Sequence, residues 1–363
     1  MDIKRLKSAL KAEGEPEYRL GQVLRAVYRA GAGSYDEISV LPSKLRLLLK
    51  RRVPMMSVSP RRVLTSSDGR ARKALLELRD GEFVESVLIK PKPGPAWSAC
   101  ISCQVGCAVR CSFCATGRMG LRRNLTSEEI ADQALFWRQH LRAEGISGKL
   151  TNVVYMGMGE PLHCLDAVFA SIRTLLDPAL LGLSARHVSV STAGIVPGID
   201  RMITEFPQVN LALSLHAADD DLRSRLVPIN KVYPLNELAA VLERVLRDTK
   251  RKVFLEYVLL DGINDSPWHA RQVSHFIGAV GRPDLLPVNL IGFNPTGTTR
   301  RSPPPWKVTG FRDALRRFGV CVTIRRSLGA DIRASCGQLA TGTKKSRTLR
   351  SPKRKKRPKK KSS

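Results

Sequence analysis

The sequence predicts an α/β fold in which parallel strands form a partial (β/α)6 barrel, preceded by a small helical domain. Short apolar segments alternate with amphipathic helical patterns, which is typical of successive strand–helix units. There are six such units, too few for the usual barrel of eight. The strands are expected at residues 99–102, 152–156, 187–191, 209–215, 253–259 and 288–293, and a last strand pattern stands at 322–325.

Residues 1–75 are expected to form the helical accessory domain. Apolar residues recur at helical spacing within residues 6–10, 20–28 and 41–49. Basic residues gather at 46–52, at the end of the third pattern. A basic helix end suits RNA binding, and it is equally typical of an ordinary solvated helix.

The rest of the chain divides where its composition changes. Residues 76–97 are predicted to form a strand pair and a linker rich in Pro and Lys, and residues 98–341 the barrel domain. Inside the barrel, Thr126 and Glu129 have the spacing of a capping box, which marks the start of a helix. Residues 342–363 are rich in Lys and Arg without an apolar core, so this tail is expected to be disordered.

The formal net charge is +29, and the 12 basic residues between 344 and 361 leave +17 for the rest of the chain. Such a charge favours a polyanionic partner such as RNA, because cations that contact phosphates release counterions. No apolar run reaches the roughly 18 residues of a membrane span, and the N-terminus lacks the apolar stretch of a secretory signal. The protein is therefore expected in the cytoplasm, without a membrane partner.

Five of the eight cysteines fall within residues 100–117. Cys107, Cys111 and Cys114 have a C-x3-C-x2-C spacing, so three thiolates can converge on one metal centre. Three ligands favour an iron–sulfur cluster with one open iron, because a structural zinc site usually takes four. Two alternatives remain open, a zinc site that adds Cys100 or Cys103, and disulfide bonds.

Small and polar residues follow four of the predicted strands. Parallel α/β sheets bind ligands at the carboxyl ends of their strands. Each segment alone is more often structural, but together they predict a ligand site at this edge. The segments are residues 157–161, 191–194, 214–216 and 294–295.

Together these motifs resemble the RlmN/Cfr family of radical S-adenosylmethionine (SAM) RNA adenine methyltransferases, over roughly residues 15–341. The cysteine spacing, with Phe113 before the last cysteine, resembles the superfamily signature, and residues 227–230, 256–258, 288–291 and 336–339 also match the family. The resemblance implies the barrel of the radical SAM type, with a 4Fe–4S cluster on Cys107, Cys111 and Cys114 and SAM on the open iron. The SAM contacts it implies are Gly159, Glu160, Ser191, Ser214, Leu215, His216 and Asn294.

The resemblance also implies three catalytic residues. Cys336 would take a methyl group from one SAM, because a thiolate can attack SAM whereas carbon 2 or carbon 8 of adenine is not nucleophilic enough. A second SAM, cleaved reductively at the cluster, would give the radical that activates this methyl group for addition to adenine. Cys100 would then attack the Cys336 sulfur, which releases the product and leaves a disulfide bond. Glu85 would act as the proton acceptor.

The implied substrate is large-subunit ribosomal RNA, with tRNA as a second substrate. A flavodoxin or ferredoxin would supply electrons, and the protein is expected to be a monomer. The target carbon stays open, because Pro161 resembles the carbon-2 branch whereas residues 92–97 and 206–210 resemble the carbon-8 branch. The segment after Asn294 departs from the carbon-2 pattern, and Cys103 stands where serine is expected.

Two other functions compete with this one. A radical SAM methylthiotransferase needs a further cysteine triad before the cluster loop, and no cysteine precedes Cys100. The non-enzymatic alternative is a basic RNA-binding protein with a structural metal site, which would lack iron–sulfur absorbance after reconstitution with iron and sulfide.

Overall fold

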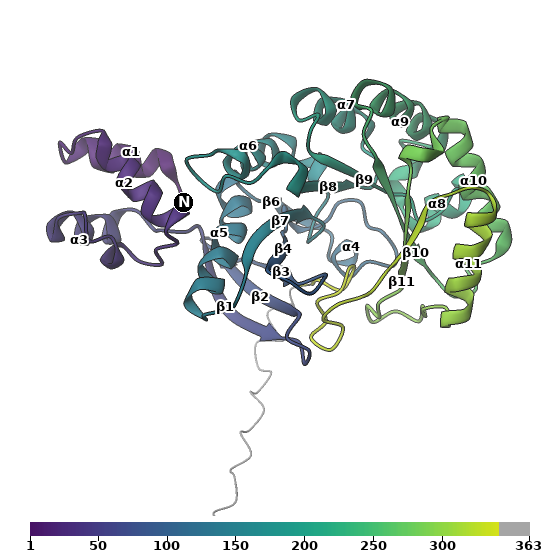
Figure 1. The fold of residues 1–363 in the computed structure, drawn as a ribbon, viewed down its shortest axis with the longest axis horizontal. Helices are drawn as coiled ribbons and strands as arrows, with labels where there is room; N and C mark the ends of the chain where they lie inside the picture. Colours follow the sequence, from purple (N-terminus) through teal and green to yellow (C-terminus); the bar gives the residue numbers. More distant parts are fainter. Residues whose placement is uncertain (341–363) are drawn as a thin grey trace, which may run out of the picture.

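The computed structural model describes residues 1–340, so the tail expected at 342–363 lies outside the described residues. One ten-stranded sheet, in the order β1-β2-β3-β4-β7-β8-β9-β10-β11-β12, forms the body of the molecule (Figure 1). Its strands are β1 (Val58–Thr65), β2 (Ala71–Leu78), β3 (Phe83–Ile89), β4 (Ala96–Cys100), β7 (Lys149–Tyr155), β8 (Val188–Thr192), β9 (Asn210–Ser214), β10 (Val253–Leu259), β11 (Val288–Gly292) and β12 (Val322–Arg325).

β4 and the strands from β7 to β12 run parallel and in chain order, which confirms the predicted partial barrel. The sheet is open because its two ends are β1 and β12, which do not pair. The predicted capping box is present, with Thr126 accepting from the Glu129 amide at the start of α5. The connecting helices are α4 (Ala115–Met119), α5 (Ser127–Ala143), α6 (Leu165–Leu176), α7 (Val196–Glu205), α8 (Asp220–Leu226), α9 (Leu235–Thr249), α10 (Pro267–Val280) and α11 (Pro305–Arg317).

Three antiparallel strands, β1 to β3, extend the sheet beyond β4. The expectation of a helical domain over residues 1–75 is therefore wrong in its second part, because β1 and the start of β2 fall within that range. β1 is an edge strand in which Ser59 to Arg62 are exposed, and Pro60 interrupts its register with β2. An exposed edge strand lacks the alternation of apolar and polar residues that reveals a strand in a sequence.

The helical part of the N-terminus ends at Arg52. Its helices are α1 (Ile3–Ala12), α2 (Tyr18–Leu24), which continues as a π-helical stretch (Arg25–Arg29), and α3 (Ser43–Arg52). Figure 1 shows these helices on the side of the molecule where α5 and α6 lie. Side chains of α5 bind them, since Arg138 Nη1 donates to the Tyr28 carbonyl at 2.5 Å and Gln139 donates to that of Ala32 at 2.7 Å.

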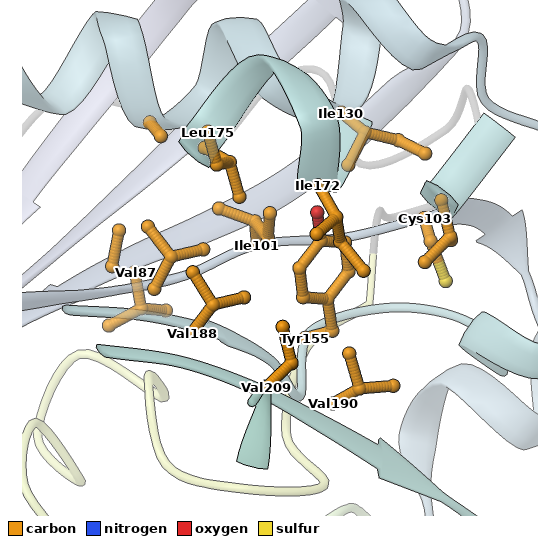
Figure 2. Packing of buried hydrophobic residues seen from close by; sticks show 14 of the residues in the cluster. Val87, Ile101, Cys103, Ile130, Tyr155, Ile172, Leu175, Val188, Val190 and Val209 are labelled. Atoms are coloured by element: carbon orange, nitrogen blue, oxygen red, sulfur yellow. The ribbon is translucent and has the colours of Figure 1, made fainter. Parts of the chain in front are cut away.

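The core between the sheet and its helices fixes the strand ends that form the site. Figure 2 shows Tyr155 at the end of β7 packed among apolar side chains that include Ile172 of α6 and Val190 of β8. The Tyr155 hydroxyl is buried and lies 2.7 Å from Ser171 Oγ, so its polar end is satisfied. None of the helices in the described part of the chain is long and apolar enough to cross a membrane.

Candidate active site

The cysteine loop is held at its base by a small separate sheet. β5 (Gln104–Gly106) pairs antiparallel with β6 (Leu121–Asn124) on the two sides of the loop. Gly106 has a φ of 80°, and a Cβ there would lie 1.7 Å from the Gly120 carbonyl oxygen, so only glycine permits this closure. Between the two strands, Cys107, Cys111 and Cys114 all line one cavity.

The three thiols suit a cluster that binds them as thiolates. Burial raises the pKa of the Cys107 thiol to about 12. Burial, together with the neighbouring Cys114 and Cys107, also raises the pKa of Cys111 well above its usual value. The positive charge of the irons would offset this cost, since metal coordination deprotonates a thiol. Within residues 1–340, no three His, Cys, Asp or Glu side chains are arranged to hold a single metal ion. A 4Fe–4S cluster places each thiolate on a different iron, so it does not require convergence on one point.

The cavity lies at the carboxyl ends of strands β7 to β12 and encloses about 990 Å³, including the part open to solvent. The cluster loop lies on one side and Cys336 with Gly337 contributes another part of the lining. Six of the predicted SAM contacts line it: Gly159, Glu160, Ser191, Ser214, His216 and Asn294.

The segment after β7 approaches the cluster loop closely. Gly159 has a φ of 107°, and a Cβ there would lie 2.7 Å from that of Gln104. The next residue, Glu160, is buried, and its carboxylate accepts amide hydrogens from Ala193 at 2.8 Å and Leu162 at 3.1 Å. Burial raises the pKa of Glu160, although these hydrogen bonds oppose the rise. Its fixed carboxylate is available to accept a hydrogen bond from an amine in the cavity.

His216 joins the strand ends to the cysteine loop. Its backbone has a φ of 59°, and its Nδ1 accepts the Val258 amide at 3.1 Å. Its ring lies edge-on to Phe113 of the cluster loop, with 4.9 Å between ring centroids. Burial lowers the pKa of His216 to about 3, so the ring is neutral at physiological pH.

Three predicted site residues, Leu215, Glu85 and Cys100, do not line the cavity. Leu215 is fully buried, and its carbonyl accepts from Arg223 Nε at 3.1 Å. Glu85 is also buried, where it pairs with Lys73 at 2.9 Å and accepts the Ala340 amide at 2.9 Å. Side-chain direction at these positions depends on tertiary packing that a motif does not specify.

Cys336 lies close enough to Cys100 to act on it electrostatically. Cys336 is exposed to the cavity, whereas Cys100 is partly buried at the end of β4. Burial raises the pKa of Cys100 to about 12, and the nearby Cys336 adds to the rise. All eight cysteines are free in this structure.

Sequence reasoning did not assign a role to Glu256 and Arg325, which both line the cavity. Arg325 Nη1 lies 3.1 Å from Glu256 Oε2, and Asn289 donates to the other carboxylate oxygen at 2.9 Å. Burial raises the pKa of Cys336, and the positive charge of Arg325 opposes that rise. The available signal was a charged residue within an apolar strand pattern, as Glu256 is in β10.

A third residue without a predicted role, Arg223 of α8, holds the segments at the strand ends through hydrogen bonds. It is fully buried and donates to the carbonyls of Ala193 at 2.7 Å and Ser214 at 3.2 Å, and to Asn230 Oδ1 at 2.7 Å. These bonds fix the segments that carry Ser191, Ser214 and His216. A buried arginine on a short polar helix has no signal in the sequence that separates it from an exposed one.

An open barrel with three thiols and polar strand ends around one cavity is the architecture of a radical SAM enzyme. The Radical SAM superfamily matches residues 101–272. The chain is 40% identical over 346 residues to a probable dual-specificity RNA methyltransferase RlmN of Chloroflexus aurantiacus, covering 93% of this chain and 91% of that protein. It is also 40% identical over 345 residues to a ribosomal RNA large subunit methyltransferase Cfr of Bacillus velezensis, covering 92% and 95%.

A solved structure agrees with these relatives. The crystal structure of a radical SAM methyltransferase from Sphaerobacter thermophilus superimposes with a TM-score of 0.87 at 43% identity, covering 93% of this chain and 97% of the other. The chain therefore belongs to the RlmN/Cfr family of radical SAM RNA methyltransferases, and its cofactors are a 4Fe–4S cluster and SAM.

Replacing Cys111 with Ala is expected to leave a protein that cannot hold the cluster, because two thiolates remain of the three predicted ligands. Iron content and charge-transfer absorbance after anaerobic reconstitution measure this loss. Cys321→Ala is the matched control, since Cys321 is exposed and does not line the cavity. Full iron loading of the Cys111 variant would contradict the assignment.

Proposed function

We propose that this enzyme methylates carbon 2 or carbon 8 of an adenosine in large-subunit ribosomal RNA, with tRNA as a second substrate, through a methyl-cysteine intermediate. The observation that carries the proposal is the position of Cys336, which opens into the same cavity as the three cluster cysteines. A thiol placed there can accept a methyl group from one SAM and hold it where the radical from a second SAM would form.

The residues around the cavity have distinct parts in this proposal. Cys107, Cys111 and Cys114 hold the cluster, which when bound supplies the electron for reductive cleavage of SAM. The SAM molecule is held by Glu160 and by the other polar residues at the strand ends. Asn294 has a second part, because its side-chain amide donates to the Cys336 carbonyl at 3.2 Å and so positions the methyl-accepting loop.

The two catalytic thiols act in sequence. The Cys336 thiolate attacks the methyl carbon of SAM, so that a carbon–sulfur bond forms in the enzyme as the sulfonium bond breaks. The radical formed from a second SAM would remove one hydrogen from this methyl group, and the carbon would then bond to the adenine ring carbon, which would lose its own hydrogen as a proton while the unpaired electron returned to the cluster. The Cys100 thiolate attacks the Cys336 sulfur, and the electron pair of the broken carbon–sulfur bond passes to the departing carbon, which takes up a proton to become the methyl group of the product. The product leaves and a disulfide between the two cysteines remains.

Glu85 is proposed as the proton acceptor. Burial raises the pKa of its carboxylate even though Lys73 opposes the rise, which favours proton uptake. Its hydrogen bond from the Ala340 amide connects it to the segment that follows Cys336. Movement of that segment would break the hydrogen bond from Ala340, which lowers the pKa of Glu85. The affinity of Glu85 for a proton would therefore depend on the position of the segment that follows Cys336.

The remaining parts of the proposal concern the setting of the reaction. We place the enzyme in the cytoplasm as a monomer, with a flavodoxin or ferredoxin as its electron donor. Relatives named RlmN are 40–44% identical to this chain and relatives named Cfr are 39–40% identical, a difference too small to choose the target carbon.

The proposal is tested by mass spectrometry of nucleosides from ribosomal RNA of cells that lack this protein and of the same cells after it is restored. One methylated adenosine should disappear and return, and comparison with synthetic standards identifies the carbon. RNA with the same nucleosides in both cell lines would contradict the proposal, and a methylthio group would favour the methylthiotransferase.

Replacing Arg325 with Met is expected to shift methylation of Cys336 to higher pH. Arg325 opposes the rise in the pKa of Cys336, so without its charge the thiolate forms only at more alkaline pH. A shift of about one pH unit is the size expected for a nearby charge. The methylated fraction of the Cys336 peptide, measured against pH, gives the midpoint. Arg325→Lys keeps the positive charge, so it should shift the midpoint less than Arg325→Met does. An unchanged midpoint in the Met variant would show that Arg325 does not act on the thiol.

A further inference from the structure

A second large depression lies at the opposite end of the barrel strands from the active site. It encloses about 1150 Å³, including its open part, between the N-terminal helices and the barrel. We call it the basic groove, defined by the five residues Arg29, Arg138, Arg142, Lys149 and His187 in its lining. Arg29 ends the helical stretch after α2, Arg138 and Arg142 belong to α5, and Lys149 and His187 stand at the starts of β7 and β8.

The charges of the basic groove are balanced by the protein only at Arg142, within the part of the chain that the structure describes. No Asp or Glu is present in the lining, within the part of the chain that the structure describes. Arg138 instead donates to the carbonyls of Tyr28 at 2.5 Å and Leu181 at 3.2 Å, and Arg29 donates to the Pro178 carbonyl. Arg142 has an acidic neighbour, but Glu37 lies 3.4 Å away and is itself exposed.

Two of these guanidinium groups repel each other. Arg138 is half-buried, and its pKa is lowered by burial and by the nearby charge of Arg29. Cations brought together without a counterion raise the free energy of the free protein, and an anion that binds between them removes that cost. Each guanidinium has five N–H donors, so those not used on carbonyls remain free for phosphate oxygens.

We propose that the basic groove binds the phosphate backbone of the RNA substrate at a point remote from the adenosine that is methylated. The groove brings together cations from the N-terminal helices and from the barrel, and in the described residues only Arg142 among them pairs with an acidic side chain. Cations spread over two structural units suit a chain of phosphates better than a single small anion. The inference rests on the proposed RNA substrate and adds a second contact to it.

The location of the groove restricts which RNA can use it. Lys149 and Tyr155 stand at the two ends of β7, where they line the groove and the active-site cavity. Seven residues in a strand span about 20 Å. A substrate must therefore extend at least this far from its target adenosine, as a large folded RNA does.

The test compares two double variants with the same change in charge. Arg142→Glu with Lys149→Glu reverses two exposed cations of the groove, and Arg316→Glu with Arg317→Glu reverses two exposed cations on α11. The binding of a folded ribosomal RNA fragment is measured over a range of salt concentrations. Thermal unfolding of each variant confirms folding, and Lys149→Ala is a milder second groove variant because Lys149 is exposed and forms no ion pair in the described residues.

The groove double variant should bind RNA about tenfold more weakly than the α11 variant, and its plot of log affinity against log salt should be shallower by about two, one for each lost phosphate contact. The kcat at saturating RNA should be unchanged. Equal affinities for the two double variants, or tight binding of free inorganic phosphate without any change in RNA affinity, would overturn the proposal. Failure of the unaltered enzyme to methylate RNA would instead refute the proposed function.

Discussion

Cys336→Ala is expected to abolish methylation of RNA while SAM binding and reductive cleavage continue. The variant keeps all three predicted cluster ligands and the strand ends that line the cavity, but it loses the thiol that accepts the methyl group. An alanine side chain has no nucleophile, so the amount of methylated RNA should fall to the detection limit and not merely decrease.

Two assays on the same sample separate these effects. Transfer of labelled methyl groups to RNA reports the complete reaction, and formation of 5′-deoxyadenosine reports cleavage of SAM. Cys321→Ala is the control, because it removes an exposed thiol that lies outside the cavity lining. Residual methylation by the Cys336 variant above background would show that another residue accepts the methyl group.

Cys100→Ala is expected to form the new carbon–carbon bond once and then stop. Cys100 lies at the end of β4, near enough to Cys336 for that thiol to raise the pKa of Cys100, and we assign Cys100 only to the release step. Without it the RNA should remain covalently attached to Cys336. A slowly migrating band on a denaturing gel, removed by nuclease, measures the adduct.

The matched control for this variant is Cys103→Ser. Cys103 is buried next to the cluster loop, where its thiol lies 3.7 Å from the Met158 carbonyl oxygen, a contact that a serine hydroxyl can also make. The Cys103→Ser variant should turn over repeatedly, and no slowly migrating RNA adduct should accumulate on the denaturing gel. Turnover of the Cys100 variant at the unaltered rate would refute its role in release.

The parallel sheet could be predicted because its strands are buried and apolar. β10, for example, follows the expected range without change, and the capping box of α5 has a local signal that needs no tertiary information. The antiparallel extension could not be predicted in full, because β1 is exposed along its middle and contains Pro60. Edge strands carry little of the apolar pattern from which strands are predicted.

In the candidate site, too, some residues could be predicted from the sequence and others could not. Most of the polar residues predicted at the strand ends line the cavity, because the direction of a parallel strand fixes where its carboxyl end lies. Leu215 does not, since it faces the core between two residues that line the cavity. Arg223 and Arg325 were missed, because their roles depend on contacts between segments distant in sequence.

The account depends most on the claim that one carbon passes through Cys336 on its way to adenine. Mass spectrometry of the Cys336 peptide from the Cys100→Ala variant, after incubation with RNA and SAM and digestion by nuclease and protease, tests it directly. The account predicts an adenosine joined to the Cys336 sulfur through a single carbon derived from the methyl group of SAM. An unmodified Cys336 peptide, or a nucleotide attached to any other residue, would contradict it.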